Sequence, residues 1–296
     1  MGRSGLLTAA LHGRITLAGG REPRMVTRII AVANQKGGVG KTTTVASLGA
    51  ALTALGRRVL LVDIDPQANL TSAVGSSKGL PGAYELLLGE VTATSVIVAV
   101  IDAAGKQVPD GARLDLIPSS PDLAGVETEL VGQANRVERL RNGLVGSIET
   151  YDYVLIDCPP ALGLLTLNAL VASASVLAPI QCEYLALEGL TQLLDTLRRV
   201  RDRLNPELRG LFLLMTMFDS RTGLGQHVVE EVRTHFPDVF LSTMIPRTIR
   251  LGEAPSYGQS IMRYDPSGRG AGAYRALAAE LDARLDAPRP ATLVGV

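Results

Sequence analysis

The 296-residue sequence has few residues suited to a metal or redox centre. Its two cysteines, Cys158 and Cys182, belong to no Cys-x-x-Cys pair and have no histidine-rich context. We therefore expect reduced thiols in the core of a cytoplasmic protein. The three histidines, His12, His227 and His235, show no metal-ligand or triad spacing, so we expect them at the surface or its boundary.

Long apolar runs and net charge are also missing. The longest apolar runs, such as residues 176–180, are strand-sized, whereas a membrane-spanning helix needs about 18 residues. The formal net charge is zero, so the whole-molecule field does not favour a polyanionic partner. Hydrophobic residues make up 46% of the chain, which is ample for a large core. The composition predicts a soluble globular protein.

Charge is unevenly distributed along the chain. Between Arg198 and Arg275, twelve arginines stand against eight acidic residues, a surplus of +4, and the remainder carries −4. Charge runs of this kind usually form solvated helix faces. A local surface that contacts nucleic-acid phosphates is the alternative, and composition alone leaves both open.

The organisation of the chain indicates one main domain. Residues 1–27 are rich in glycine and arginine, with an apolar patch at 5–11 too short for a secretory signal, and we predict a disordered extension. Met25 stands just before the first strand, so a mis-assigned start codon would explain this extension. Residues 28–285 are predicted to form one domain, and residues 286–296 a flexible tail.

The hydrophobic pattern predicts an α/β fold. An apolar strand at 29–33 is followed by a glycine-rich turn, a helix at 41–55 and a strand at 59–63, which together form a βαβ unit. Helix-length segments separate the later strands, and residues 91–111 form a loosely patterned peripheral excursion. We expect a doubly wound, mostly parallel sheet flanked by helices, with the later strands at 114–117, 153–157, 175–180 and 211–217.

The turn after the first strand has the composition of a phosphate-binding loop. Its sequence is Lys36-Gly37-Gly38-Val39-Gly40-Lys41-Thr42-Thr43. Glycines let successive backbone N–H groups converge on phosphates, and the following helix adds the positive end of its dipole. We expect Lys41 to reach the β- and γ-phosphates of ATP, Thr42 to ligate Mg²⁺, and Thr43 to contact the α-phosphate.

Three aspartates follow strands that should end beside this loop. Asp63 and Asp65 follow one strand, and Asp157 ends another. In a P-loop NTPase, an acid such as Asp157 typically holds Mg²⁺ through a water. We expect Asp65 to position the attacking water, and Asp63 either to support the metal from its second shell or to cap a turn. Each acid taken singly fits a helix cap equally well.

The glycine-rich loop departs from the ordinary Walker A motif. The pattern G-x-x-x-x-G-K-[ST] requires glycine where this chain has Gln35. The loop resembles instead the deviant Walker A motif of the P-loop NTPases in the ParA/MinD superfamily, in which the first lysine, here Lys36, reaches the partner's nucleotide across a dimer interface. The resemblance therefore implies catalysis by Lys36, Lys41 and Asp65, and hydrolysis that requires dimerisation.

The resemblance to chromosomal ParA (Soj) proteins extends over most of residues 27–285. It is specific in six stretches: 63–69, 157–166, 181–190, 217–222, 245–258 and 264–271. It implies an ATP-bound homodimer, non-specific binding to double-stranded DNA, a ParB-like partner and a nucleoid-associated location. The residues that it places around the adenine are Met217, Pro246 and Arg247. Arg221 and Arg250 are the leading DNA contacts that it implies, and Arg198, Arg233 and Arg263 are further candidates.

Three rival functions have different requirements. A MinD-like membrane-associated ATPase needs a basic amphipathic helix at its C-terminus, whereas residues 274–285 contain Glu280 and Asp282, and prolines follow at 288 and 290. A metal-cluster carrier needs a cysteine pair. A scaffold that has lost hydrolysis would be expected to lack one of the catalytic residues, yet all are present.

Overall fold

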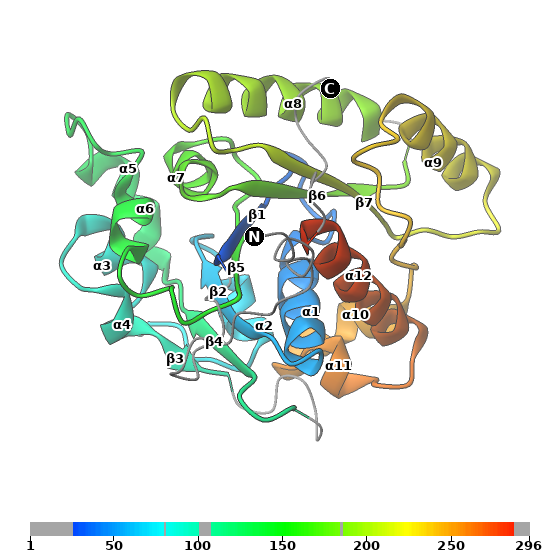
Figure 1. Cartoon of the computed structure of the whole chain (residues 1–296), viewed down its shortest axis with the longest axis horizontal. Helices are drawn as coiled ribbons and strands as arrows, with labels where there is room; N and C mark the ends of the chain where they lie inside the picture. Colours follow the sequence, from blue (N-terminus) through cyan, green and yellow to red (C-terminus); the bar gives the residue numbers. More distant parts are fainter. Residues whose placement is uncertain (1–25, 80, 101–107, 184–185, 287–296) are drawn as a thin grey trace, which may run out of the picture.

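A seven-stranded sheet forms the centre of the molecule (Figure 1). The computed structural model describes residues 26–79, 81–100, 108–183 and 186–286. The strand order across the sheet is β3-β4-β2-β5-β1-β6-β7. The bounds are β1 Arg28–Val32, β2 Arg58–Asp63, β3 Val98–Ala99, β4 Arg113–Ile117, β5 Tyr153–Asp157, β6 Ser175–Gln181 and β7 Gly210–Thr216.

Six of these strands are parallel, and only the β3 edge pairs antiparallel with its neighbour. Parallel strands bring their carboxyl ends to one edge of the sheet, where ligands bind in open α/β folds. Asp157 is in register with Val32 of β1 and with Asp63 of β2. The loops that follow β1, β2 and β5 therefore emerge side by side.

Helices cover both faces of the sheet. Alternation along β1 shows the two layers, because Ile30 and Val32 face one apolar cluster and Ala31 and Ala33 the other. The first cluster is covered by α1 Lys41–Ala54, α2 Asn69–Ala73, α10 Ile249–Glu253, η2 Ala254–Tyr257, α11 Ile261–Tyr264 and α12 Arg269–Asp286. The second is covered by α3 Ala83–Leu88, α4 Ala93–Val96, η1 Pro121–Gly125, α5 Val126–Glu129, α6 Arg139–Leu144, α7 Leu164–Ala172, α8 Ala186–Arg203 and α9 Gly223–His235. The predicted doubly wound, mostly parallel architecture is confirmed.

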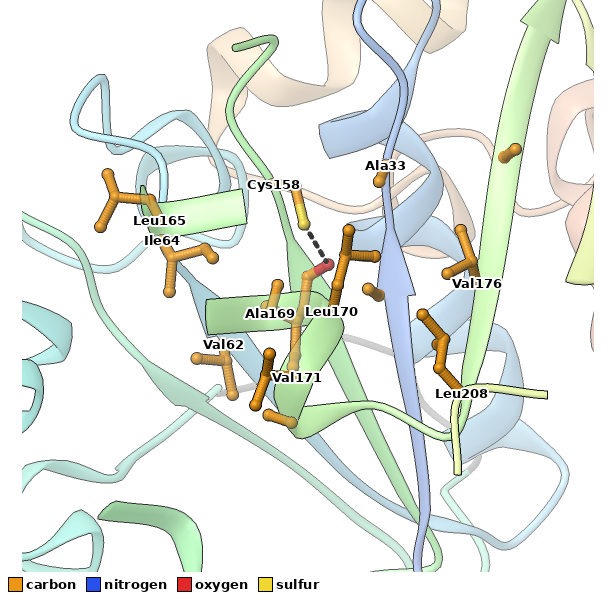
Figure 2. Packing of buried hydrophobic residues seen from close by; sticks show 14 of the residues in the cluster. Ala33, Val62, Ile64, Cys158, Leu165, Ala169, Leu170, Val171, Val176 and Leu208 are labelled. Carbon is orange, nitrogen blue, oxygen red and sulfur yellow. Dashed lines mark hydrogen bonds between the residues drawn. The ribbon is translucent and has the colours of Figure 1, made fainter. Parts of the chain in front are cut away.

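Both cysteine side chains pack in or against the second apolar cluster. Cys158 belongs to the second cluster, and its Sγ lies 3.9 Å from the carbonyl oxygen of Ile156 (Figure 2). Burial raises the pKa of the Cys158 thiol far above its usual range, with the Asp157 charge contributing. Burial also raises the pKa of Cys182 to about 11. Both thiols are therefore protonated at neutral pH.

Local backbone geometry explains where the elements depart from the predicted bounds. We predicted a strand over 211–217, but β7 ends at Thr216 because Met217 takes a φ of 52°. The peripheral excursion over 91–111 supplies α4 and the two-residue edge strand β3. Residues 1–25, 101–107 and 287–296 lie outside the described residues, and so do most of the predicted extension and all but the first residue of the predicted tail. Within the described ranges, no helix is both long and apolar enough to span a bilayer.

Candidate functional site

The loop between β1 and α1 forms an open, glycine-lined cradle. Gly38 and Gly40 have φ values of 75° and 91°, which strain any residue with a Cβ. Within the part of the chain that the structure describes, a Cβ added at Gly37, Gly38 or Gly40 would meet no atom within 4 Å beyond its own chain neighbours. The space beside the loop is thus free for a ligand, and α1 begins at Lys41 directly after it. The cradle fits a chain of phosphates.

Two buried polar side chains fix this loop to the neighbouring strands. The Asn34 amide donates to the carbonyl oxygen of Pro179 in β6 at 2.7 Å, and its oxygen accepts from the Lys36 N–H at 3.0 Å. The Thr216 hydroxyl, at the end of β7, donates to the carbonyl oxygen of Val39 at 2.9 Å. Neither anchor was predicted from the sequence, where the only signal for each is a polar residue at the end of an apolar strand.

Lys41 is held inside the cradle. Its side chain is buried, and Nζ donates to the carbonyl oxygen of Lys36 at 3.2 Å. Burial lowers the pKa of Lys41, although the charges of Asp157 and Asp65 oppose that shift. An ammonium group with so little water around it interacts strongly with any anion that enters the cradle.

Thr42 and Asp157 form a pair that suits Mg²⁺. The Thr42 hydroxyl donates to Oδ2 of Asp157 at 2.7 Å. Asp157 is fully buried, and among the described residues its Oδ1 has no hydrogen-bond partner. Burial raises the pKa of Asp157 well above its usual range, and the Asp63 charge raises it further. A buried carboxylate oxygen without a partner fits an oxygen-coordinated divalent cation or its bound water.

Both carboxylate oxygens of Asp63 accept hydrogen bonds from other residues of the chain. Its Oδ1 accepts from the Asp65 N–H at 3.1 Å, and its Oδ2 accepts from the N–H and hydroxyl of Thr71 at 2.8 and 2.7 Å. Burial raises the pKa of Asp63 to about 6, while these hydrogen bonds lower it. Of the two roles left open by the sequence, these contacts favour support of the turn.

Asp65 follows β2 with its backbone fixed on both sides. Its Oδ1 accepts from the Gln67 N–H at 2.9 Å. Its carbonyl oxygen accepts from the Ala68 N–H at 2.8 Å and from the Ser119 hydroxyl at 2.7 Å. The residue as a whole is only 8% exposed. Ser119 and Thr71 were not anticipated from the sequence.

Lys36 is paired within its own chain. Its Nζ lies 2.6 Å from Oε2 of Glu183, which follows β6. The lysine side chain is 40% exposed and that of the glutamate 49%, so water screens this ion pair. Lys36 therefore lies at the rim of the cradle, with Glu183 as a partner that the sequence analysis did not anticipate.

The two segments predicted around the adenine are adjacent. The Phe218 N–H donates to the carbonyl oxygen of Ile245, and the Arg247 N–H donates to that of Phe218, each at 3.0 Å. Phe218 and Pro246 form an isolated parallel bridge. The structure thus brings Met217, Pro246 and Arg247 together beyond the end of β7.

The predicted DNA-contacting arginines are not all on one face. Arg250 and Arg263 belong to α10 and α11 on one side of the sheet, whereas Arg198 and Arg233 belong to α8 and α9 on the other (Figure 1). Arg221 lies in the loop between β7 and α9 and is 86% exposed.

Most of these arginines have acidic neighbours close in sequence. The Arg221 guanidinium donates two hydrogen bonds to Asp219, of 2.9 and 2.7 Å, and the Arg221 N–H donates a third of 3.0 Å. Arg250 bonds to Glu253 at 3.1 Å and lies over the Tyr264 ring. Arg198 and Arg233 pair with Asp195 and Glu230 on their own helices. If these arginines bind DNA, phosphates would have to replace the carboxylates as the partners of their guanidinium groups.

Known proteins are similar to this chain in sequence and in structure. A family model described as an AAA domain matches residues 27–210. The sporulation initiation inhibitor protein Soj of Bacillus subtilis is 50% identical over 258 residues, which cover 86% of this chain and 98% of Soj. The chromosome partitioning protein ParA of Myxococcus xanthus is 47% identical over 282 residues, covering 93% of this chain and 96% of ParA.

A solved structure of a Mycobacterium smegmatis protein, named cobyrinic acid a,c-diamide synthase and bound to an ATP analogue and magnesium, is also similar. It is 41% identical with a TM-score of 0.77, covering 90% of this chain and 99% of that chain. Identity near one half, sustained over almost the full length of the Bacillus and Myxococcus proteins, shows that this chain belongs to the ParA/Soj family of partitioning ATPases.

Proposed function

We propose that this protein binds Mg-ATP, forms a sandwich dimer around two nucleotides, binds DNA without sequence preference, and hydrolyses ATP when a ParB-like partner stimulates it. The observation that carries the proposal is the Thr42–Asp157 pair, with its free buried oxygen beside the glycine cradle. The Mycobacterium smegmatis relative, bound to an ATP analogue and magnesium, supports the choice of ligand. The cargo would be a replicon, which such a cycle moves or positions.

The cradle and its cations would bind the nucleotide. The backbone N–H groups of residues 37–43 and the ammonium of Lys41 would hold the phosphates. Thr42 would ligate Mg²⁺ directly, and Asp157 would hold one of its waters through Oδ1. Magnesium supplies positive charge to the terminal phosphate as negative charge develops on it. Phosphoryl transfer needs positioned cations and water rather than a covalent nucleophile, and the site offers these groups.

Hydrolysis would need two further residues. Asp65 would orient the attacking water through the carboxylate oxygen that Gln67 leaves free. Lys36 would leave Glu183 and reach the γ-phosphate in the partner subunit, in the way that an arginine finger does. Because the Lys36–Glu183 pair is partly exposed, its exchange would cost about 1 kcal/mol or less. Monomers would then bind ATP but hydrolyse it slowly.

DNA binding would depend on the dimer. Arg221 and Arg250 are both well exposed, and two-fold symmetry would place two copies of each on the assembly. Contacts to phosphates alone give affinity that depends on salt and not on sequence. A chain with zero net charge can bind DNA through such a local surface.

The rival functions fit the structure less well. A MinD-like membrane contact through α12 would need an apolar face, yet Tyr274, Leu277 and Leu281 of that helix are buried against the sheet. The name of the Mycobacterium smegmatis relative suggests an amide synthase as a further rival, and such an enzyme, if it draws ammonia from an amide donor, needs a nucleophilic thiolate. Both thiols here have raised pKa values, and among the described residues no histidine ring hydrogen-bonds to either.

The test measures nucleotide binding, dimerisation and DNA binding in parallel. Lys41→Ala should abolish ATP binding, because the remaining site lacks the buried ammonium. Asp65→Ala should bind ATP, accumulate as a dimer and retain DNA binding, because only hydrolysis is removed. A Lys41→Ala variant with unchanged ATP affinity would contradict the assignment of the site.

The DNA surface has its own matched control. Arg221→Ala/Arg250→Ala should keep ATP binding and reduce the slope of log K against log salt by about 3 to 4, since four contacts per dimer are lost. The control, Arg141→Ala/Arg209→Ala, removes the same charge from exposed local ion pairs elsewhere and should leave the slope unchanged. Equal slopes for both double variants would remove Arg221 and Arg250 from the DNA surface.

A further inference from the structure

A closed ring of buried hydrogen bonds fixes the backbone around Asp65. The Ser119 hydroxyl donates to the Asp65 carbonyl oxygen at 2.7 Å, and the Asp65 N–H donates to Asp63 at 3.1 Å. The peptide groups before and after the Asp65 Cα are therefore both held. Ser119 is fully buried, so no water competes for its hydroxyl.

Thr71 completes the ring. Its hydroxyl accepts from the Ser119 N–H at 2.9 Å and donates to Asp63 at 2.7 Å, and its own N–H donates to the same Asp63 oxygen at 2.8 Å. Thr71 is also fully buried. Ser119 follows β4, Thr71 lies on α2, and Asp63 ends β2, so three separate elements converge on one residue.

The ring restricts how Asp65 can face a ligand. Both peptide groups are held and Oδ1 accepts from the Gln67 N–H, so the carboxylate has little freedom to turn, and Oδ2 can accept from a water. A displacement of about 1 Å in a positioned group can reduce a reaction rate by about 100-fold. The orientation of the carboxylate therefore depends on how firmly its backbone is held.

We propose that Ser119 and Thr71 are positioning residues for ATP hydrolysis. They act through Asp65, without touching the nucleotide, and the inference rests on the proposed role of Asp65 in orienting the attacking water. Ser119 holds the Asp65 carbonyl group, and Thr71 holds Ser119 and Asp63. Both residues control the rate of the chemical step rather than the affinity for ATP.

The experiment is single-turnover hydrolysis of Mg-ATP by the full chain loaded with one ATP per subunit, with DNA present, alongside the Kd for ATP. Ser119→Ala should lower the rate constant about tenfold, the effect of about one hydrogen bond, with the Kd unchanged within about twofold. Thr71→Val, which keeps the shape but removes the hydroxyl, should act alike, and Thr71→Ser should restore most of the rate.

The matched control is Ser120→Ala. Ser120 is also buried, but its hydroxyl contacts Asp122 at 3.4 Å and not Asp65. It should hydrolyse ATP at the wild-type rate. The Thr71→Val and Thr71→Ser pair decides the matter should Ser119→Ala fail to fold.

Three results would overturn the inference. The first is a wild-type rate for Ser119→Ala and Thr71→Val. The second is a loss of ATP affinity in parallel with the rate, which would make the ring a general support for the site. The third is a Thr71→Ser variant as slow as Thr71→Val. A wild-type protein that hydrolyses no ATP even with DNA and a ParB-like partner present would instead refute the proposed function itself, and this inference with it.

Discussion

Replacing Asp63 with asparagine should change how the stability of the nucleotide-free protein depends on pH. Asp63 is fully buried, and its pKa rises from an ordinary value of 3.8 to about 6. At a pH well below 3.8, the carboxyl group is protonated in the folded and unfolded chains alike. As the pH rises, the unfolded chain releases this proton first, so the stability that Asp63 contributes is lost as the pH passes through about 6.

The size of this effect follows from the shift in pKa. A change of about two pKa units corresponds to about 3 kcal/mol in the free energy of unfolding. The asparagine side chain carries no charge, so the variant should not lose stability in this way. Its single carbonyl oxygen cannot keep the acceptor bonds to both Asp65 and Thr71, which lowers its stability at every pH. Asp63 also raises the pKa of Asp157, so its neutralisation should ease the ionisation of Asp157 and enlarge the difference.

The assay is urea denaturation followed by circular dichroism, with EDTA and without nucleotide, between about pH 4 and pH 7. The stability of Asp63→Asn minus that of wild type should rise by up to about 3 kcal/mol over this range. Asp152→Asn is the control, and its difference from wild type should stay nearly constant over this range. Burial raises the pKa of Asp152, but hydrogen bonds and the charge of Arg58 outweigh it, so the stability from Asp152 is lost only as the pH falls below about 4. A flat or falling difference for Asp63→Asn would refute the reasoning.

Three further predictions concern residues around the site and a contact at the opposite end of the strands. Thr216→Val removes the hydroxyl that donates to Val39, and calorimetry should show the Kd for ATP rising about tenfold, while Thr216→Ser stays near wild type; equal Kd values would contradict the anchor. Glu183→Gln frees Lys36 from a partly exposed pair, and sedimentation velocity should show ATP-dependent dimerisation strengthened by up to about fivefold; a weaker dimer would contradict the exchange. Asp282→Asn weakens the 2.6 Å hydrogen bonds that Asp282 accepts from Arg57 and Tyr153, so chemical denaturation should show the free energy of unfolding falling by about 1 to 3 kcal/mol. Glu207→Gln, in an exposed ion pair, should lower it by less than about 1 kcal/mol. Equal losses for the two variants would show that the Asp282 contacts stabilise the fold no more than an exposed pair does.

The parallel strands and the phosphate loop could be predicted because their signals are local. Residues 153–157 are five consecutive residues of a buried strand, and the sequence placed that strand with the bounds that the structure has. Gly38 and Gly40 occur in a short motif whose glycines are required by positive φ values. Such features depend on residues a few positions apart, so a single sequence carries them.

The supporting contacts could not be predicted, because they join residues that are distant in sequence. Thr216 and Val39 are 177 positions apart, Lys36 and Glu183 are 147 apart, and Ser119 and Asp65 are 54 apart. A polar residue at the end of a strand has many possible partners until the strand order is known. Sequence placed Asp65 at the site, but only the packing of β4 beside β2 shows what holds it.

The end of β7 illustrates a smaller limit. Met217 continues the apolar run of the strand, so periodicity predicts that the strand includes it. The structure instead turns the backbone there to a φ of 52°, a conformation that side chains with a Cβ seldom adopt. Tertiary pairing of Phe218 with Ile245 fixes that turn, and it overrides the local preference.

The most direct test of the account is an activity measurement on a mixture of two inactive variants, Lys36→Ala and Asp65→Ala. Each should bind ATP, and each should hydrolyse it poorly alone. In a mixed dimer, the Lys36→Ala subunit keeps its own Asp65 and receives Lys36 from the other subunit, so an equal mixture should recover about a quarter of wild-type activity. A mixture that forms mixed dimers and stays inactive would show that Lys36 does not act across the interface.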